Sequence, residues 1–151
     1  MSMRERLKTT FPDVFEEMKQ RKKPVEKHIP AKCENEYLYV TASNAGVSQG
    51  LLGQTLSVEE GCRAARECAI RLLENIAESL GSLDAVKAVV RCTVLVTSDA
   101  HFGELDIVAD AFSDTLIEFL GSRGIHVRTV LGATALEKAA TVAADAFVLV
   151  R

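Results

Sequence analysis

The chain contains no tryptophan, and only two tyrosines and six phenylalanines occur among its 151 residues. Proteins that hold single-stranded nucleic acid stack bases on aromatic side chains, so this composition offers little for such a platform. Positive charge is also scarce, because 21 acidic residues outnumber 18 lysines and arginines and the formal net charge is -3. A weakly acidic chain without a basic stripe repels phosphate backbones, and we therefore do not expect nucleic acid as a partner.

Uninterrupted apolar runs of about 18 residues, the length that a membrane span needs, are missing from the sequence. The N-terminal stretch MSMRERLKTTFPDVFEE is too polar and acidic for a secretory signal peptide, so we expect a cytoplasmic protein without membrane contact. The four cysteines, Cys33, Cys62, Cys68 and Cys92, show neither metal-ligand spacing nor a CxxC pair. We interpret them as reduced, small core residues, and we expect no metal and no cofactor. Nucleotide-binding glycine motifs and the GxSxG motif are lacking as well.

Hydrophobic periodicity divides the chain into elements. Residues 2–20 carry apolar side chains at helical intervals and lead into the cationic segment QRKKP, which predicts an N-terminal helix. A strand is predicted over 36–42 because of its aromatic and β-branched residues, with 25–31 as its possible hairpin partner. Residues 43–55 contain three glycines and are predicted to form a loop.

Two amphipathic helices follow from capping signals and apolar stripes. The segment Ser57-Val58-Glu59-Glu60 has the spacing of a capping box, which predicts a long helix that ends at Gly81. A second helix is expected to begin at a cap formed by Ser98 or Asp99. Its predicted apolar stripe consists of Leu105, Val108, Phe112, Leu116 and Phe119.

Between and after these helices, the sequence favours strands. Residues 86–97 alternate with period two, and further strands are predicted over 126–134 and 141–150. One wholly apolar face is expected on the first of these strands, formed by Val86, Ala88, Val90, Cys92, Val94 and Val96. Two helices cover only one face of such a sheet, and the other face is also partly apolar, with Val89 and Leu95. An uncovered sheet of this kind usually meets another subunit.

The order of these elements, the junction VxxTVxVTSxxxF over residues 90–102 and an arginine followed by a hydroxyl residue after the second helix are specific features. In these respects the chain resembles, over roughly residues 25–150, the reactive-intermediate deaminase family, also called RidA/YjgF or endoribonuclease L-PSP. The resemblance implies a chorismate-mutase-like α+β domain over 25–151, preceded by an N-terminal helical extension over 1–24. It also implies a mixed sheet with two main helices on one face, and a homotrimer with clefts at the subunit interfaces.

The same resemblance implies that Arg128 grips the carboxylate of a small ligand in the cleft, with backbone groups near Thr129 and Thr41 polarising it. A guanidinium fits this role because its planar fork of donors matches a carboxylate and stays charged in a partly buried site. The residues alone also allow a simpler interpretation. In that interpretation Arg128 lies at a strand edge and pairs with an acidic surface residue.

Other cleft positions differ from the family pattern. His28 stands where relatives have an aromatic residue that lines the cleft, although a polar residue of an edge strand is an equal alternative. Thr41 matches the start of the family's Ser-Gly-Gln segment, but Ala42 replaces its glycine. The methyl group of Ala42 is expected to narrow the space in which a ligand contacts the backbone. Asp106 replaces an asparagine of many relatives, and it is otherwise an ordinary acid in the first turn of a helix.

The largest departure concerns the acid that positions the attacking water in deaminating relatives, about fifteen residues after the arginine. Ala143 occupies that position here. Asp145 lies on the same strand face, but a shift of two residues moves a side chain by about 6 to 7 Å, beyond hydrogen-bond reach. The cysteine that many relatives carry two residues after the arginine is Val130.

Three functions therefore remain open at this stage. The first is binding of keto or imino carboxylates at trimer-interface clefts, with possible metal-free hydrolysis of 2-imino acids. The second is a non-catalytic metabolite-binding or regulatory trimer. The third is the endoribonuclease activity of the family's other name, which is disfavoured because the chain is acidic and its histidines, His28, His101 and His126, are scattered.

Overall fold

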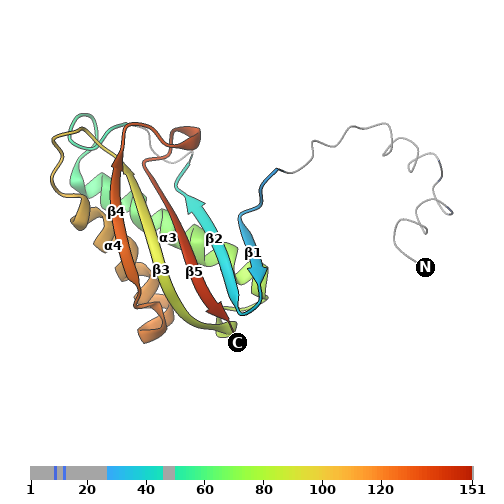
Figure 1. Ribbon diagram of the computed structural model, residues 1–151. Coiled ribbons are helices and arrows are strands. Elements are labelled where there is room, and N and C mark those ends of the chain that lie inside the picture. The colour runs from blue at the N-terminus through green and yellow to red at the C-terminus, as the bar shows by residue number, and fades with distance from the viewer. Residues whose placement is uncertain (1–8, 10–11, 13–26, 46–49, 151) are drawn as a thin grey trace.

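The computed structural model describes residues 9, 12, 27–45 and 50–150 of the chain. Apart from the two isolated positions, the predicted N-terminal helix and the predicted extension over 1–24 lie outside these residues. The described chain forms one sheet with two helices packed on the same face of it (Figure 1). This is the predicted α+β architecture. No helix in the described part of the chain has both the length and the apolar character to cross a bilayer.

The sheet is mixed and has five strands in the order β1-β2-β5-β3-β4. Its strands are β1 Ala31–Glu34, β2 Tyr37–Ser43, β3 Val86–Thr97, β4 Val127–Ala133 and β5 Val142–Val150. Only β3 and β4 run parallel among these strands, because the second helix connects them as a crossover. The three strands predicted in the second half of the chain are therefore confirmed.

Helix α3, Val58–Leu80, has the predicted ends. The Ser57 hydroxyl accepts a hydrogen bond from the backbone N–H of Glu60 at 3.2 Å, as expected for the N-terminal residue of a capping box. Gly81 ends the helix with φ 83°, and its N–H donates to the carbonyl of Ala77. The face toward the sheet is made of small and branched side chains, so the helix packs closely on β2 and β5.

Helix α4, Leu105–Leu120, begins later than predicted. Neither Ser98 nor Asp99 caps it. Asp99 instead accepts hydrogen bonds from the backbone N–H of His101 at 2.8 Å and from Gln54 at 2.9 Å, and these bonds hold the pKa of its carboxyl below the ordinary value. Phe119 was also wrongly placed in the core, since its side chain is 56% exposed and Leu120 is buried in its stead.

Strand β3 breaks the regular alternation that the sequence suggested. Register shifts lie between Val86 and Ala88 and between Val89 and Arg91. As a result Val89 is buried at 2% exposure whereas Val90 is 41% exposed, the reverse of the prediction. Each register shift turns the side chains that follow it to the opposite face, so the first shift brings Val89 onto the apolar face and the second returns the alternation to Cys92, with Val94 and Val96 after it.

The first hairpin also differs from the prediction. Strand β1 pairs with β2 from Ala31 to Glu34, so the predicted partner strand over 25–31 is wrong at residues 27–30, and its first two residues lie outside the described chain. The turn contains Asn35 with φ 55°, a conformation that asparagine adopts more readily than most residues. This hairpin places Cys33 at the surface, contrary to its expected place in the core.

The remaining thiols define a testable difference in reactivity. Cys68 and Cys92 are buried, and desolvation raises the pKa of each thiol from 9.0 to about 12. The thiolate is the reactive form, so we expect Cys33 to react first with a thiol-specific reagent at pH 8, and the two buried thiols only after unfolding. Counting titrated thiols with and without guanidinium chloride measures this. Rapid labelling of Cys68 or Cys92 in the folded protein would contradict it.

The same two thiols link stability to alkaline pH. Their folded-state pKa lies above the ordinary value of 9.0, so the stability they contribute is present below pH 9. It is lost as the pH rises toward 12, because the unfolded chain releases these protons first. We therefore expect the denaturation midpoint to fall across that range.

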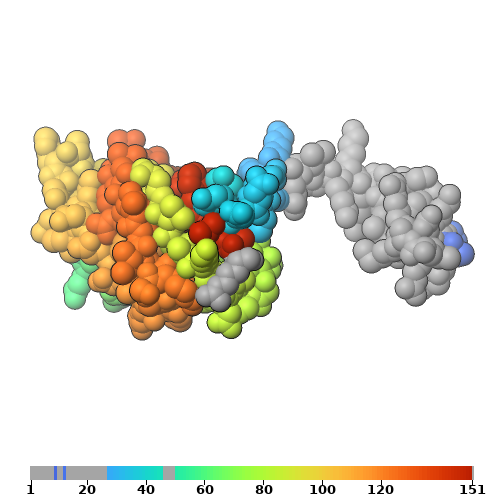
Figure 2. Space-filling model, turned by 60° about the horizontal axis from the view of Figure 1, so that its bottom comes forward, coloured from blue at the N-terminus to red at the C-terminus, as the bar shows by residue number. Residues whose placement is uncertain are grey.

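The face of the sheet opposite the helices is open. Strand register brings Tyr39, Phe147, Arg91 and Val127 into one row on this face, and Tyr39 and Phe147 meet edge to face with ring centroids 4.8 Å apart. Figure 2 shows side chains of β4 (orange), β3 (yellow-green), β5 (red) and β2 (cyan) next to one another at the surface. Large apolar side chains of this face are about half exposed, including Leu131 at 50%. The expectation that helices cover only one face is confirmed.

Candidate functional site

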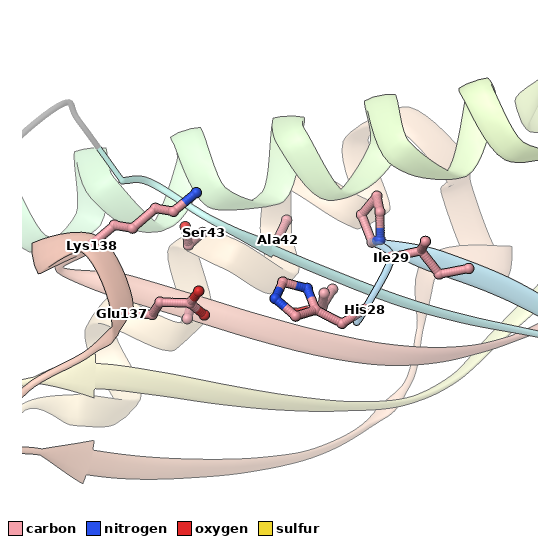
Figure 3. A pocket seen from close by; sticks show the side chains of 9 residues that line it. His28, Ile29, Ala42, Ser43, Glu137 and Lys138 are labelled. Carbon is pink, nitrogen blue, oxygen red and sulfur yellow. The ribbon is translucent and has the colours of Figure 1, made fainter. Parts of the chain in front are cut away.

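A pocket of ≈ 380 Å³ lies beside the ends of β2 and β5, under the 3-10 turn Glu137–Ala139. Figure 3 shows side chains from three segments of the chain around it. Its lining residues are His28, Ile29, Pro30, Thr41, Ala42, Ser43, Glu137, Lys138 and Ala143. The pocket therefore gathers groups that are up to 115 positions apart in the sequence.

The pocket brings together three of the residues predicted for the site, namely His28, Thr41 and Ala42. Ala143, at the position where an acid was expected, lies in the same wall. The Thr41 hydroxyl donates to the carbonyl of Ala144 at 3.0 Å, which leaves its oxygen lone pairs as acceptors. These four positions share one cavity although they come from three separate segments.

Side chains from α3 hold the β2 wall of this pocket by its backbone. Asn75 donates to the carbonyl of Thr41 at 2.8 Å, and Arg71 donates to the carbonyls of Ser43 at 3.1 Å and Ala45 at 2.8 Å. These roles could not be predicted from the sequence, since both residues look like ordinary polar positions of an amphipathic helix. They fix the strand end that the candidate ligand would approach.

A buried asparagine joins the same strand end to the start of β5. Asn44 is fully buried, and its side-chain oxygen accepts from the backbone N–H groups of Thr141 and Val142, each at 2.8 Å. The N–H of Asn44 in turn donates to the carbonyl of Val142 at 3.0 Å. This junction sets the position of the turn that carries Glu137 and Lys138.

Arg128 lies outside this pocket, on the edge strand β4. It is paired in register with Cys92, whose side chain is buried on the helix side, so Arg128 points toward α4. Its guanidinium contacts Asp110 at 2.9 Å and donates to the Ser113 hydroxyl at 2.9 Å. The side chain of Arg128 is 20% exposed and that of Asp110 is 62% exposed. Within one chain, the simpler interpretation of a strand-edge ion pair thus describes its contacts.

The network around Arg128 continues to His126. The imidazole Nδ1 lies 2.6 Å from the carbonyl oxygen of Gly124, and Nε2 lies 3.0 Å from the Ser113 hydroxyl. A carbonyl can only accept, so Nδ1 carries a proton, and in the neutral imidazole Nε2 then accepts from Ser113. Ser113 thereby stays oriented to accept from Arg128. Neither Asp110 nor Ser113 was identified from the sequence.

Thr129 and Asp106 also lie away from the pocket. Thr129 faces the open side of the sheet, where its hydroxyl accepts from Arg91 at 2.8 Å. Asp106 is exposed in the first turn of α4, one turn before Asp110. Two strands, β5 and β3, separate β2 from β4, a distance of about 14 Å at about 4.8 Å per strand. The predicted site residues therefore fall into two separate groups within one chain, one at the pocket and one at β4 and α4.

Asp145, the alternative acid, does not line the pocket. Side chains of Tyr39, Thr41, Asp145 and Phe147 border a second depression of ≈ 320 Å³ on the open face. Within the described ranges, no three His, Cys, Asp or Glu side chains are arranged to hold a metal ion.

Several known proteins resemble this chain in sequence or in fold. No protein-family model matches the chain. Protein TCP17 of Trypanosoma cruzi is 34% identical over 131 residues, which cover 83% of this chain and 82% of that protein. The crystal structure of Atu1372 from Agrobacterium tumefaciens, a protein described as having unknown function, has a TM-score of 0.81 and 27% identity, with 83% of each chain covered.

Two further structures share the fold. A proposed endoribonuclease from Shewanella oneidensis MR-1 has a TM-score of 0.79 and 20% identity over 85% of this chain and 88% of that one. The YjgF gene product of E. coli has a TM-score of 0.57 and 14% identity over 85% of this chain and 91% of that one.

Proposed function

The chain belongs to the RidA/YjgF family, also called endoribonuclease L-PSP, and from this premise we propose that it binds small 2-keto or 2-imino carboxylates in clefts between the subunits of a homotrimer. We further propose that it hydrolyses 2-imino acids there without a metal. The observation that carries the proposal is the pocket that unites His28, Thr41, Ala42 and Ala143. Its volume of ≈ 380 Å³ suits a small organic acid.

Assembly of the trimer is supported by the open face of the sheet. Its half-exposed apolar side chains include Val127 at 62% and Phe147 at 43%, and burying such groups is favourable. β4 is an edge strand with unpaired backbone groups on its outer side, among the strands described. When subunits pack with these surfaces together, the β4 edge of one can complete the pocket of the next.

The ligand carboxylate would then be held by Arg128 from the neighbouring subunit. In the single chain this guanidinium is engaged by Asp110, which is 62% exposed. Pairs this open contribute about 0 to 1 kcal/mol, so a ligand carboxylate in a desolvated cleft can displace Asp110 or share the fork with it. The hydroxyl of Ser113 keeps the guanidinium oriented in either case.

Two other functions belong to different classes. A binding trimer without turnover is favoured by Ala143, because the expected strand acid is missing. An endoribonuclease is not supported by the described histidines: His28 lines the pocket, whereas His126 is occupied by Gly124 and Ser113. Cytoplasmic location is part of our proposal, and the four free thiols suit a reducing compartment.

The decisive experiment combines mass, binding and turnover. Sedimentation of the full chain is expected to give three times the 16.4 kDa subunit mass. A short 2-keto acid should raise the melting temperature, and a 2-imino acid generated freshly by an amino-acid oxidase should release ammonia faster than in buffer. A monomer without ligand-induced stabilisation would refute the proposal. A trimer that binds the keto acid but releases no extra ammonia would leave the binding function and remove the deaminase.

A further inference from the structure

We propose that Glu137 supplies the carboxylate that positions and deprotonates the attacking water, in place of the acid missing at Ala143. This inference rests on the proposed deaminase function and names a catalytic residue for it. Among the described residues that line the pocket, Glu137 is the one acid. It enters from the turn before β5 and not from the strand itself.

The geometry of the pocket places this carboxylate where it is needed. Figure 3 shows the Glu137 carboxylate directed into the cavity, toward the side on which the His28 imidazole lies. Ala143 lines the same cavity, and its methyl group leaves room that a glutamate there would fill. The pocket therefore has a methyl group on the wall where an acid was expected, and it carries a carboxylate on the adjoining wall.

Asp145 is the competing candidate, and its position argues against it. Its side chain borders the second depression, next to Tyr39 and Phe147. It is displaced from Ala143 by two residues of an extended strand, or about 6 to 7 Å. Glu137 lines the pocket directly, whereas Asp145 would require β5 to slide.

The side chains of Glu137, Lys138 and His28 are available to a ligand. In the part of the chain that the structure describes, no hydrogen bond or ion pair engages any of these three ionisable groups. Three unengaged groups of this kind around one cavity form a polar site of mixed charge. A zwitterionic or iminium-bearing acid is the small ligand whose charges they complement.

The turn that presents Glu137 is held in an unusual conformation. Lys138 and Ala139 both have φ 55°, although neither is glycine. Such residues cost of order 1 to 3 kcal/mol each and persist where surrounding contacts fix them. Those contacts are present, because the Thr97 N–H donates to the carbonyl of Thr141 at 2.8 Å and Asn44 holds the N–H of Thr141. The turn is thus anchored at its end, with its side chains directed at the pocket.

The chemistry needs only water and the substrate. Glu137 accepts a proton from water as the water oxygen bonds to the iminium carbon and the C=N π pair moves to nitrogen, giving a carbinolamine. It then returns this proton to nitrogen. As the C–N bond breaks, the O–H bonding pair closes the carbonyl and its proton passes to the departing ammonia. The products are the 2-keto acid and ammonium, and no redox change occurs.

The test compares Glu137→Gln with a matched control, Glu118→Gln, on the exposed side of α4. Glutamine keeps the shape of the side chain but cannot accept the proton. We expect kcat for ammonia release from the freshly generated 2-imino acid to fall about 100-fold in Glu137→Gln, with KM nearly unchanged. Glu118→Gln should match the unmodified chain.

A rescue variant makes the result specific. Glu137→Gln combined with Ala143→Glu returns a carboxylate to the strand wall and should recover at least about tenfold of the lost rate. Thermal unfolding of each variant excludes loss by misfolding. If the unmodified chain releases ammonia and Glu137→Gln matches it, the inference is wrong and the deaminase function stands. If the unmodified chain releases none, deamination and the role of Glu137 are refuted together.

Discussion

Replacing Asn44 with alanine is expected to lower the free energy of unfolding by about 3 kcal/mol. The side-chain oxygen of this fully buried residue accepts hydrogen bonds from the backbone N–H groups of Thr141 and Val142, both at 2.8 Å. Alanine removes the acceptor but leaves both donors buried, and each unsatisfied group costs about 1 to 3 kcal/mol. Guanidinium denaturation measures this as a lower midpoint at constant slope.

Asn75→Ala is the matched control for this prediction. Asn75 donates one hydrogen bond to the carbonyl of Thr41, but it lies in a more exposed position, where water can replace the amide. Its loss should cost about 1 kcal/mol or less. If both variants lose the same stability, the junction at Asn44 is not the special anchor described above.

The Asn44→Ala substitution should also weaken ligand binding at the pocket. Thr141 begins the segment that follows the turn with Glu137 and Lys138, and its N–H would lose its partner. We infer that the turn then samples other conformations, because its two residues with φ 55° are stable only while its ends are fixed. Reduced ligand-induced stabilisation in Asn44→Ala, beyond its lower starting stability, is the corresponding observation.

Local patterns predicted those parts of the fold that depend on neighbouring residues. The capping segment before α3 and its closing glycine, Gly81, were recognised because each acts within one helical turn. The bulge in β3 was not recognised, since it depends on how β5 pairs across the sheet. The start of α4 was missed for a similar reason: Gln54, 45 residues away, helps to hold Asp99 in a turn.

The candidate site shows the same division. His28, Thr41 and Ala42 were assigned to one cleft by resemblance, and they do line one pocket. Glu137 and Asn44 were overlooked because their roles arise from contacts across the fold. The contacts of Asn44 span 97 and 98 residues. Neither hydrophobic periodicity nor motif spacing records such long-range pairings. For Arg128, the residues alone allowed an ion pair with an acidic surface residue, but they did not identify Asp110 as that residue.

The second large effect is expected at Arg128. We predict that Arg128→Ala weakens binding of a short 2-keto acid by about 10- to 100-fold, because hydrogen bonds to charged groups contribute about 1.5 to 3 kcal/mol. Arg128→Lys should recover only part of this, since an ammonium keeps the charge but not the planar fork. The rise in melting temperature at increasing ligand concentration measures the loss.

Folding effects should be separable from binding in this series. Arg128 pairs with Asp110, which is 62% exposed, so losing the pair should change the free energy of unfolding by about 1 kcal/mol at most. Lys87→Ala removes one positive charge from an exposed residue of β3 beside Glu36 and Val150, apart from Arg128 and from the pocket, and it should bind the keto acid normally. Mixed trimers provide the sharpest test. If Arg128 serves the neighbouring subunit, co-assembly of Arg128→Ala with a variant defective on the pocket side, Ala42→Leu, should restore full affinity in some clefts, whereas each variant alone binds weakly in every cleft. If assembled mixed trimers do not regain binding, Arg128 of one subunit does not act together with the pocket of its neighbour.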